Sequence, residues 1–518
     1  MKIVLTDKQN YRTRFVADNC FYIIPQEEHC VLCSTFHEAI DYIPPQNRVL
    51  DPVALLSLLT FGYVCGDRTM VRGLKRIPLH SIINSKGEIL RKRQLPHGCE
   101  RAPIQEIAQK LLDLLTDEID NVVQNESEVV ILLSGGLDSR VTAGVLKRLQ
   151  DGYKFSVKAI TWGSMQSRDW AFADRICGIY GWEHVNVPIG PETLWRNVKR
   201  SVDSVGAEVA GAHFHAIKEL NEYLPKDVVI LVSTYGDSIG RAAYSGLHIE
   251  DLDFQKVNNR DGLFYQAWFR RCQDALIDDM RAPLSRGDVC TQQQAYEIAS
   301  QENYLRRMLN VLMHCLDDKF RLYQVFTSEP VVRYMWSFDT SIRDDRVYQT
   351  LIPMLDYELA RIPWQKTNRA LVEDAWSPSV GCARGFCDYP SWIHTELREQ
   401  FEAFLLGDSL KDLLYVNHGH VRCDWEQFQK MDARHPFFER ISLRFVRLVG
   451  VLMLMKDYQI VCDDTPFTKT WYDRTDLALR VTWQIRELRH YYWQYTTRAF
   501  SRKSPRFLPT GLHGEDLK

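Results

Sequence analysis

The alternation of helical and strand-like segments after residue 103 limits most strongly how this chain can fold. Apolar residues recur at helical spacing between 107 and 122, and helical stretches also separate the later apolar runs. The strand-like runs are residues 129–133, 155–161, 183–187 and 228–232. Because parallel strands need a crossover of about helix length, this order predicts an α/β fold with a doubly wound, Rossmann-like parallel sheet.

Different patterns precede and follow this region. Residues 1–100 read as short strands and turns, with one helix expected at 52–60 after Asp51, a residue type that caps helices well. From residue 261 onward the chain reads as mostly helical. We therefore predict a small β-rich domain at 1–100, the α/β domain at 101–260 and a helical remainder at 261–518.

Composition excludes several classes of protein. Lys and Arg number 64 against 67 Asp and Glu, so the net charge of −3 gives no sign of nucleic-acid binding. The most apolar stretch, 448–455, stops at Lys456 and is too short to span a membrane. Thirteen cysteines and an N-terminus without a signal-peptide core favour reduced thiols and a cytoplasmic protein.

The strongest chemical signal is the stretch from Leu133 to Ser139, which joins the run 129–133 to a helix. Gly135 and Gly136 allow the backbone to approach an anion, and the helix beyond them offers free N–H donors. Ser134 and Ser139 add hydroxyl donors. We therefore expect a cradle for phosphate or pyrophosphate. An ordinary glycine-rich turn is the alternative.

Asp138 places a carboxylate within this expected anion site. Such a group repels phosphate unless a hard cation lies between them, so the sequence predicts Mg²⁺. The loop has no lysine, which distinguishes it from the phosphate loop of kinases and GTPases.

The stretch Ser134-Gly-Gly-Leu-Asp-Ser139 resembles the signature of the PP-loop ATP pyrophosphatases. Two further segments are similar to asparagine synthetases: 160–163 with 167–169, and the loop 233–238. In that loop Thr234 and Tyr235 stand where the family has Gly and Glu.

This resemblance implies a set of roles. ATP would be held by Leu133, Ser134, Gly135, Gly136, Asp138, Ser139, Thr161, Gly163, Tyr235 and Gly236. Asp138 and Asp237 would bind Mg²⁺, and Lys366 and Asp237 would be catalytic. For Lys366 a solvated loop position is the alternative. Glu329 could act as a base in lactam-forming relatives, but we favour a surface ion pair for it.

Two other patterns have simpler interpretations. His213 and His215 are predicted to lie in solvent or along a substrate channel and not to bind metal. Cys30 and Cys33 lack a second ligand pair at zinc spacing, so we expect two buried thiols.

Asparagine synthetases that use glutamine begin with Met-Cys, whereas residue 2 here is Lys. The segments around 51–56, 61–69 and 73–78 are similar to the closing part of a glutaminase domain. We therefore expect a glutaminase remnant that does not hydrolyse glutamine. Ammonia or an amine would come from solution, from the substrate or from a partner protein.

The sequence thus predicts an asparagine synthetase-like, ATP-dependent amide ligase. It would adenylate a small-molecule or peptide carboxylate, release pyrophosphate and transfer the acyl group to ammonia or an amine. One alternative to asparagine biosynthesis is a specialised lactam or peptide-modifying synthetase, and another is a nucleotide-binding module without catalysis. Transfer of sulfur or nitrogen to tRNA is disfavoured, because Cys177 is the one cysteine between 100 and 271. A second copy of this chain is a candidate partner.

Overall fold

The computed structural model describes most of the chain up to residue 473. The described residues are 2–14, 16, 22–92, 97–243, 256–259, 262–286, 291–314, 319–373, 385, 387–432, 435, 438–469 and 473.

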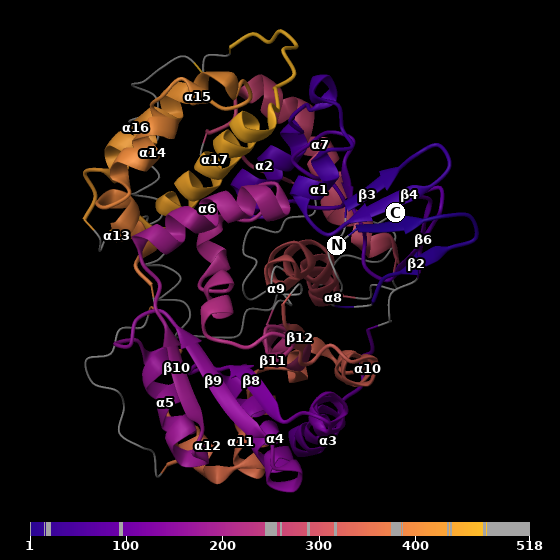
Figure 1. The fold of residues 1–518 in the computed structure, drawn as a ribbon, viewed down its shortest axis with the longest axis vertical. Coiled ribbons are helices and arrows are strands. Elements are labelled where there is room, and N and C mark those ends of the chain that lie inside the picture. The colour runs from indigo at the N-terminus through magenta and orange to yellow at the C-terminus, as the bar shows by residue number, and fades with distance from the viewer. Residues whose placement is uncertain are drawn as a thin grey trace.

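A five-stranded parallel sheet forms the centre of the α/β region (Figure 1). Its order is β10-β9-β8-β11-β12, and every neighbouring pair is parallel. The strands are β8 (Glu128–Leu132), β9 (Ser156–Trp162), β10 (Glu183–Val187), β11 (Val229–Val232) and β12 (Arg321–Gln324). The chain runs outward from β8 to β10, then returns to the other side of β8. This confirms the doubly wound sheet and places a switch point between β8 and β11.

Alternate residues of the strands pack against different layers. Val129 and Ile131 of β8 belong to a core shared with α3 (Ile104–Val123), α4 (Leu137–Tyr153) and α11 (Asp345–Leu355). Val130 faces a second core, formed with Phe214, Ile217, Met308 and Leu312 among others. Both faces of the sheet are therefore covered, as long apolar strands require.

The edge strand β12 lies beyond residue 260, which was the predicted end of the α/β domain. Its sequence, Arg-Leu-Tyr-Gln, is short and only partly buried, so it lacks the apolar run that reveals the inner strands. It nevertheless pairs along its whole length with β11. The sheet is therefore built from residues on both sides of that boundary.

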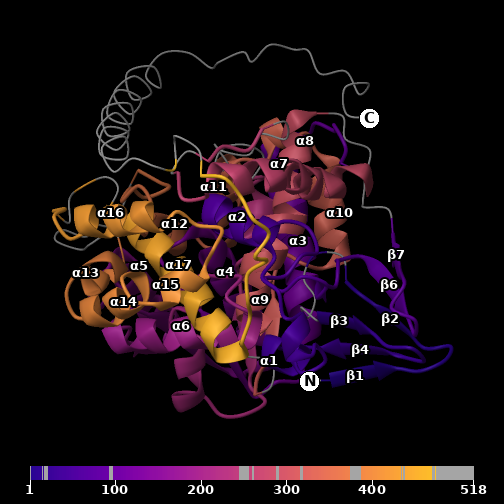
Figure 2. The ribbon, with the colours of Figure 1, turned by 90° about the horizontal axis from the view of Figure 1, so that it is seen from above.

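Two small antiparallel sheets make up the N-terminal region, and Figure 2 shows their strands together at one edge of the molecule. One has the order β1-β4-β3-β5 and the other β2-β6-β7. Their strands are β1 (Lys2–Leu5), β2 (Asn10–Arg12), β3 (Tyr22–Pro25), β4 (Cys30–Cys33), β5 (Lys75–Arg76), β6 (Ser81–Asn84) and β7 (Ile89–Arg91). The expected helix is α2 (Pro52–Phe61), and Asp51 caps it by accepting the N–H groups of Val53 and Ala54.

Helices dominate the described part of the chain after residue 261, apart from β12. They are α7 (Gln266–Arg281), α8 (Gln292–Ala299), a π-helix (Ser300–Asn310), α9 (Val311–His314), α10 (Glu329–Ser337), α11, α12 (Tyr357–Arg361), α13 (Tyr389–His394), α14 (Arg398–Leu405), α15 (Ser409–Asp412), α16 (His418–Phe428) and α17 (Phe438–Tyr458). None of the helices in the described ranges is both long and apolar enough to cross a bilayer.

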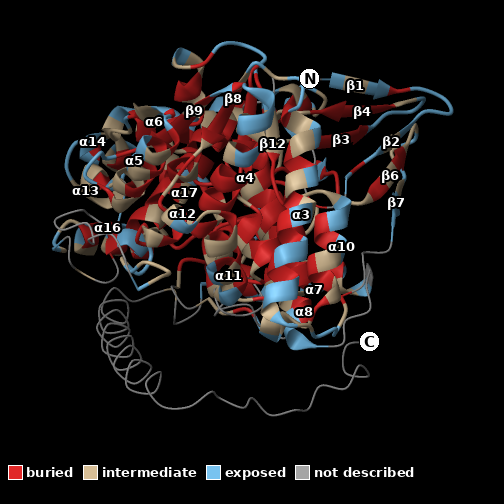
Figure 3. Cartoon of the chain, turned by 90° about the horizontal axis from the view of Figure 1, so that it is seen from below, coloured by how far each residue is buried: buried red, intermediate tan, exposed pale blue. Residues whose placement is uncertain are grey.

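One hydrophobic core joins the two ends of the described chain. It contains Tyr22 and Phe36 from the N-terminal region, Leu194 from α6 (Pro191–Val205), and Trp425 and Phe445 from α16 and α17. Figure 3 shows buried residues both in the N-terminal strand β3 and in the helix α17. The region 1–100 therefore shares its interior with the helices after 261.

A buried ion pair network crosses the same interface. Glu208 Oε2 accepts hydrogen bonds from Arg76 Nε of β5 at 3.0 Å and from Arg307 Nη2 of the π-helix at 2.7 Å. The Arg76, Glu208 and Arg307 side chains are only 3%, 1% and 1% exposed. The single carboxylate therefore compensates two guanidinium groups that water does not reach.

We expect Glu208→Ala to lower the free energy of unfolding by about 3–5 kcal/mol, because it leaves two buried cations without their counterion. The matched control is Glu329→Ala, because Glu329 is 61% exposed and, among the described residues, its ion pair is with Arg333 on the same helix. That change is expected to cost under about 0.5 kcal/mol. Urea denaturation at neutral pH checks both, and equal losses would contradict the assignment.

Candidate functional site

The expected loop leads from β8 directly into α4, whose N-cap is Gly136. No side chain caps this helix end, so its first-turn N–H groups and the positive end of its dipole are available to an anion. Ser139 shapes the loop: its Oγ accepts the Ser134 N–H at 3.2 Å and lies 3.1 Å from Ser134 Oγ. Ser134 Oγ in turn accepts the Gly136 N–H at 3.2 Å.

A cavity of about 510 Å³ opens beside this loop at the carboxyl end of the sheet. It lies at the switch point between β8 and β11, where open α/β sheets bind ligands. Its lining comes from the loop, from the ends of β8, β9 and β11, and from the π-helix and α9. The residues are Leu132, Leu133, Ser134, Gly136, Asp138, Ser139, Ile160, Thr161, Trp162, Asp169, His213, His215, Val232, Ser233, Thr234, Tyr304, Met308, Leu309, Leu312, Met313 and Gln365.

The two loop glycines serve close packing and not an unusual backbone angle. Gly136 has a φ of −74°, which any residue can adopt. At Gly135 an added Cβ would lie 2.9 Å from the Cβ of Gln365 and 3.0 Å from a ring carbon of Phe172. Gly135 is therefore required because α5 (Arg168–Tyr180) and the segment 362–366 press against the loop from both sides.

Arg140, which the sequence analysis did not single out, holds that segment in place. Its side chain is fully buried, and its guanidinium donates to the carbonyls of Leu359, Ile362 and Pro363 at 3.1, 2.7 and 2.9 Å. Gln365 N also donates to Gly135 O at 3.1 Å. Because these three carbonyl partners of Arg140 lie more than 200 residues away in sequence, no local pattern could have identified its role.

Asp169 supports the loop from α5. Its Oδ1 accepts the Gly135 N–H at 3.1 Å, and its side chain borders the cavity. Burial raises the pKa of Asp169 to about 6, although the Gly135 hydrogen bond opposes the shift. Ser167 begins α5 by accepting the Trp170 N–H at 3.2 Å, in the segment that resembles asparagine synthetases.

Asp138 does not have the surroundings expected of a Mg²⁺ ligand. Arg241 binds its carboxylate with two hydrogen bonds, from Nε to Oδ1 at 3.2 Å and from Nη2 to Oδ2 at 2.9 Å. Hard cations bind through carboxylate oxygens directly, and both oxygens of Asp138 are already engaged. Among the described residues, no group of three or more His, Cys, Asp or Glu side chains could hold a metal ion. With both of its oxygens bound by Arg241, Asp138 does not fit the predicted metal.

Lys366 and Asp237 lie near the same corner of the site. Lys366 lines a smaller cavity of about 210 Å³ together with Arg241 and Asp345, and its Nζ lies 5.3 Å from the ring centre of Trp364. Asp237 acts electrostatically on Arg241, whose pKa it helps to raise. The Asp138–Arg241 pair thus stands between the main cavity and the cavity that contains Lys366.

The other predicted nucleotide contacts divide into two groups. Thr161 lines the cavity, although its Oγ1 donates to Leu133 O at 2.7 Å, whereas Gly163 lies in the turn beyond it with a φ of 92°. Tyr235 does not line the cavity: it is fully buried, and its hydroxyl donates to Val16 O at 3.4 Å. Gly236 packs against Asp138, where an added Cβ would lie 2.7 Å from the Asp138 Cβ.

The two histidines singled out in the sequence both line the cavity. Burial lowers the pKa of His213 to about 3 and that of His215 to about 4, so both are neutral at pH 7. His215 Nδ1 lies 3.0 Å from the Tyr389 hydroxyl, and its ring stacks 5.7 Å from that of Trp162. They therefore contribute polar atoms and aromatic surface without positive charge.

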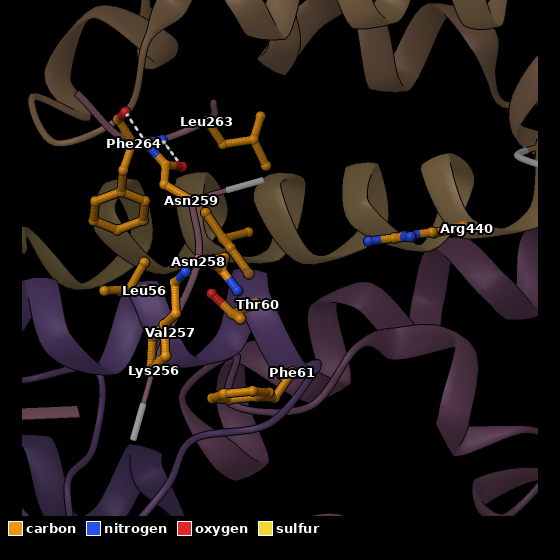
Figure 4. Close-up of a pocket in the computed structure, with 11 residues that line it drawn as sticks. Leu56, Thr60, Phe61, Lys256, Val257, Asn258, Asn259, Leu263, Phe264 and Arg440 are labelled. Atoms are coloured by element: carbon orange, nitrogen blue, oxygen red, sulfur yellow. Dashed lines mark hydrogen bonds between the residues drawn. The ribbon is translucent and has the colours of Figure 1, made fainter. Parts of the chain in front are cut away.

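Other predicted features lie away from this cavity. Cys30 and Cys33 are fully buried free thiols, and Glu329 pairs with Arg333 on the surface. A separate cavity of about 50 Å³ lies between α2, α17 and the residues 256–259 and 263–264 (Figure 4). There Asn259 and Phe264 exchange two hydrogen bonds, at 2.9 and 3.3 Å. This cavity holds none of the predicted catalytic groups.

The family model described as asparagine synthase matches residues 110–341. This region is an asparagine synthase domain. The match begins within α3 and ends after α10, so it includes the whole parallel sheet and the loop that leads into α4. Like the sheet, the match extends past residue 260, the predicted end of the α/β domain. No curated protein matches the chain.

Three solved structures are similar to this chain, each with a TM-score of 0.20. An NH₃-dependent NAD synthetase from Campylobacter jejuni is 22% identical, with 27% of this chain and 61% of that chain covered. An NMN synthetase from Francisella tularensis is 16% identical, with 48% and 97% covered. The U34-tRNA thiolase NcsA from Methanococcus maripaludis is 11% identical, with 53% and 92% covered. Similarity this slight adds nothing on function.

The buried carboxyl of Asp169 predicts a pH effect on stability. Its pKa of about 6 in the folded protein exceeds the value of about 3.9 expected in the unfolded chain. The folded state therefore binds this proton more tightly, and the protein loses stability as the pH rises from about 4 to about 6. Asp169→Asn removes this loss and keeps an oxygen that can accept the Gly135 N–H.

Relative to the unmodified chain, we expect Asp169→Asn to gain at most about 3 kcal/mol between pH 4 and pH 7. Urea denaturation at several pH values measures the difference. Asp151→Asn is the control, because Asp151 is 65% exposed on α4 and its only described ion pair is with Lys147. Parallel stability curves for Asp169→Asn and the unmodified chain would contradict the prediction.

Proposed function

We propose that this chain is an ATP-dependent amide-forming ligase. It would adenylate a substrate carboxylate and pass the acyl group to ammonia or an amine. The observation that carries the proposal is the placement of the Ser134–Ser139 loop, within an asparagine synthase domain, at the mouth of a 510 Å³ cavity. The open N-terminus of α4 is suited to the phosphates of ATP, and Thr161 and Trp162 border the space left for the nucleoside.

In the first step a carboxylate oxygen would attack the α-phosphorus of ATP, and the bond to pyrophosphate would break. The resulting acyl-adenylate is a mixed anhydride, so an amine nitrogen can attack its acyl carbon. AMP then leaves with the electron pair of the broken acyl–oxygen bond, and the amine loses a proton. The contribution of this chain would be to bind the leaving pyrophosphate at α4, align the reactants and keep water away.

The lining of the cavity favours a substrate with an uncharged, apolar body over free aspartate. The π-helix and α9 contribute four apolar side chains: Met308, Leu309, Leu312 and Met313. Among the described lining residues there is no Lys or Arg, and both histidines are neutral at pH 7. The second carboxylate of aspartate would therefore find no cation in the lining to pair with, and the buried carboxyl of Asp169 borders the same space. Of the predicted alternatives, a specialised amide or lactam synthetase suits this lining better.

A panel of carboxylates separates these possibilities through ATP–pyrophosphate exchange. We expect apolar carboxylates, such as N-acyl amino acids with aliphatic side chains, to support exchange at least about tenfold faster than aspartate, a difference of about 1.4 kcal/mol. Aspartate as the best substrate would overturn the choice of substrate class. ATP binding without exchange for any carboxylate would instead identify a nucleotide-binding module without catalysis.

The loop geometry predicts the effect of Ser139→Ala on the same reaction. The change removes the hydroxyl that accepts the Ser134 N–H and contacts the Ser134 hydroxyl. The loop proposed to bind phosphate would then lose its shape. We expect exchange to fall by about tenfold or more. Ser156→Ala, at the opposite end of β9, is the control and should change exchange by less than about twofold. Equal effects would contradict the role of the loop.

A further inference from the structure

Arg241 uses its whole guanidinium group to join two acidic side chains at the edge of the nucleotide site. Besides the two hydrogen bonds to Asp138, its Nη1 donates to Asp345 Oδ1 at 2.5 Å. Asp138 belongs to the first turn of α4 and Asp345 to the first turn of α11. Arg241 therefore links two helix N-termini that would otherwise present unpaired carboxylates toward the same place.

Arg241 lies in a largely buried position, enclosed by aromatic rings and carboxylates, and does not form an ordinary surface ion pair. Its side chain is only 10% exposed, and its guanidinium carbon lies 5.6 Å from the ring centre of Tyr348 and 6.0 Å from that of Trp364. Tyr348 is itself fixed, since its hydroxyl donates to Gly236 O at 2.7 Å. Aromatic faces and carboxylates both favour a cation at this position.

The charge on Arg241 persists throughout the physiological pH range. Burial by itself would lower its pKa, but Asp138, Tyr348 and Asp237 together raise it above its ordinary value. Lys366 lines the same small cavity and brings a second cation to this corner. The corner where ATP phosphates would approach Asp138 therefore contains permanent positive charge from the chain itself.

We propose that Arg241 supplies the cation that Asp138 needs when ATP phosphates bind, in place of a metal ion held by that carboxylate. A metal could reach Asp138 only by displacing a guanidinium that makes three hydrogen bonds and lies against two aromatic rings. This inference rests on the proposed function, because it takes ATP as the ligand. Arg241 acts here by neutralising Asp138, which lines the main cavity, from the smaller cavity beside it.

Calorimetric titration of the full chain with ATP tests this directly, once in excess EDTA and once with millimolar Mg²⁺. We expect the two dissociation constants to agree within about threefold, because the positive charge is already present. Binding that falls tenfold or more in EDTA overturns the inference and leaves the proposed function standing. No binding in either buffer overturns both.

Substitution at Arg241 then separates its charge from other effects. Arg241→Gln exposes the carboxylate of Asp138 to the phosphates, so binding in EDTA should weaken by about tenfold or more. Added Mg²⁺ should recover most of the loss, since the oxygens of Asp138 are then free to bind it. Unchanged binding of Arg241→Gln in EDTA would overturn the inference.

Two further variants complete the test: a double variant that also removes the charge of Asp138, and a matched control. Asp138→Asn combined with Arg241→Gln removes the repelling charge together with its partner, and should recover binding in EDTA relative to Arg241→Gln alone. Arg346→Gln is the matched control, because Arg346 lines the same small cavity but pairs with Asp344 on the surface. It should bind ATP as the unmodified chain does. Far-ultraviolet circular dichroism confirms that each variant is folded, and failure of the double variant to recover binding counts against the inference.

Discussion

The strand β8 ends at Leu132 and the helix α4 begins at Leu137, so four residues must connect the sheet to the helix. That short passage leaves the first N–H groups of α4 without a capping side chain, and it does so at the sheet's switch point. The surrounding structure preserves this geometry: Asp169 binds the Gly135 N–H, Ser139 binds Ser134, and Arg140 secures the segment that covers Gly135. The position proposed for the phosphates therefore follows from the course of the backbone.

Buried charge is handled in the same way at two distant places. At the interface of the N-terminal strands with the helices, Glu208 compensates Arg76 and Arg307. At the edge of the cavity, Arg241 compensates Asp138 and Asp345. In both cases a single charged group faces two of opposite sign in a region with little water, where an unpaired charge would be costly. The first arrangement joins the N-terminal strands to the helices, and the second neutralises two carboxylates at the edge of the cavity.

Much of the sheet could be predicted because its signals are local. The apolar run at 129–133 overlaps the five-residue strand β8, and the glycine-rich passage after it has a composition that few other structures require. The edge strand β12 escaped prediction because it is four residues long and only partly buried. Tyr235 was expected beside the nucleotide, yet it is buried against Val16, a contact across more than 200 residues that no spacing reveals.

The class of the fold, the position of the glycine-rich loop and the kinship with asparagine synthases can be predicted from the residues alone, because periodicity and short motifs are local features of the chain. The charge that accompanies Asp138 depends instead on how the chain folds. Arg241 lies 103 residues further along the chain, and it is brought to Asp138 by the return of the chain through β11. The carboxylate in the motif indicates that a cation should lie nearby. The folded chain determines whether that cation is a metal ion or a guanidinium group.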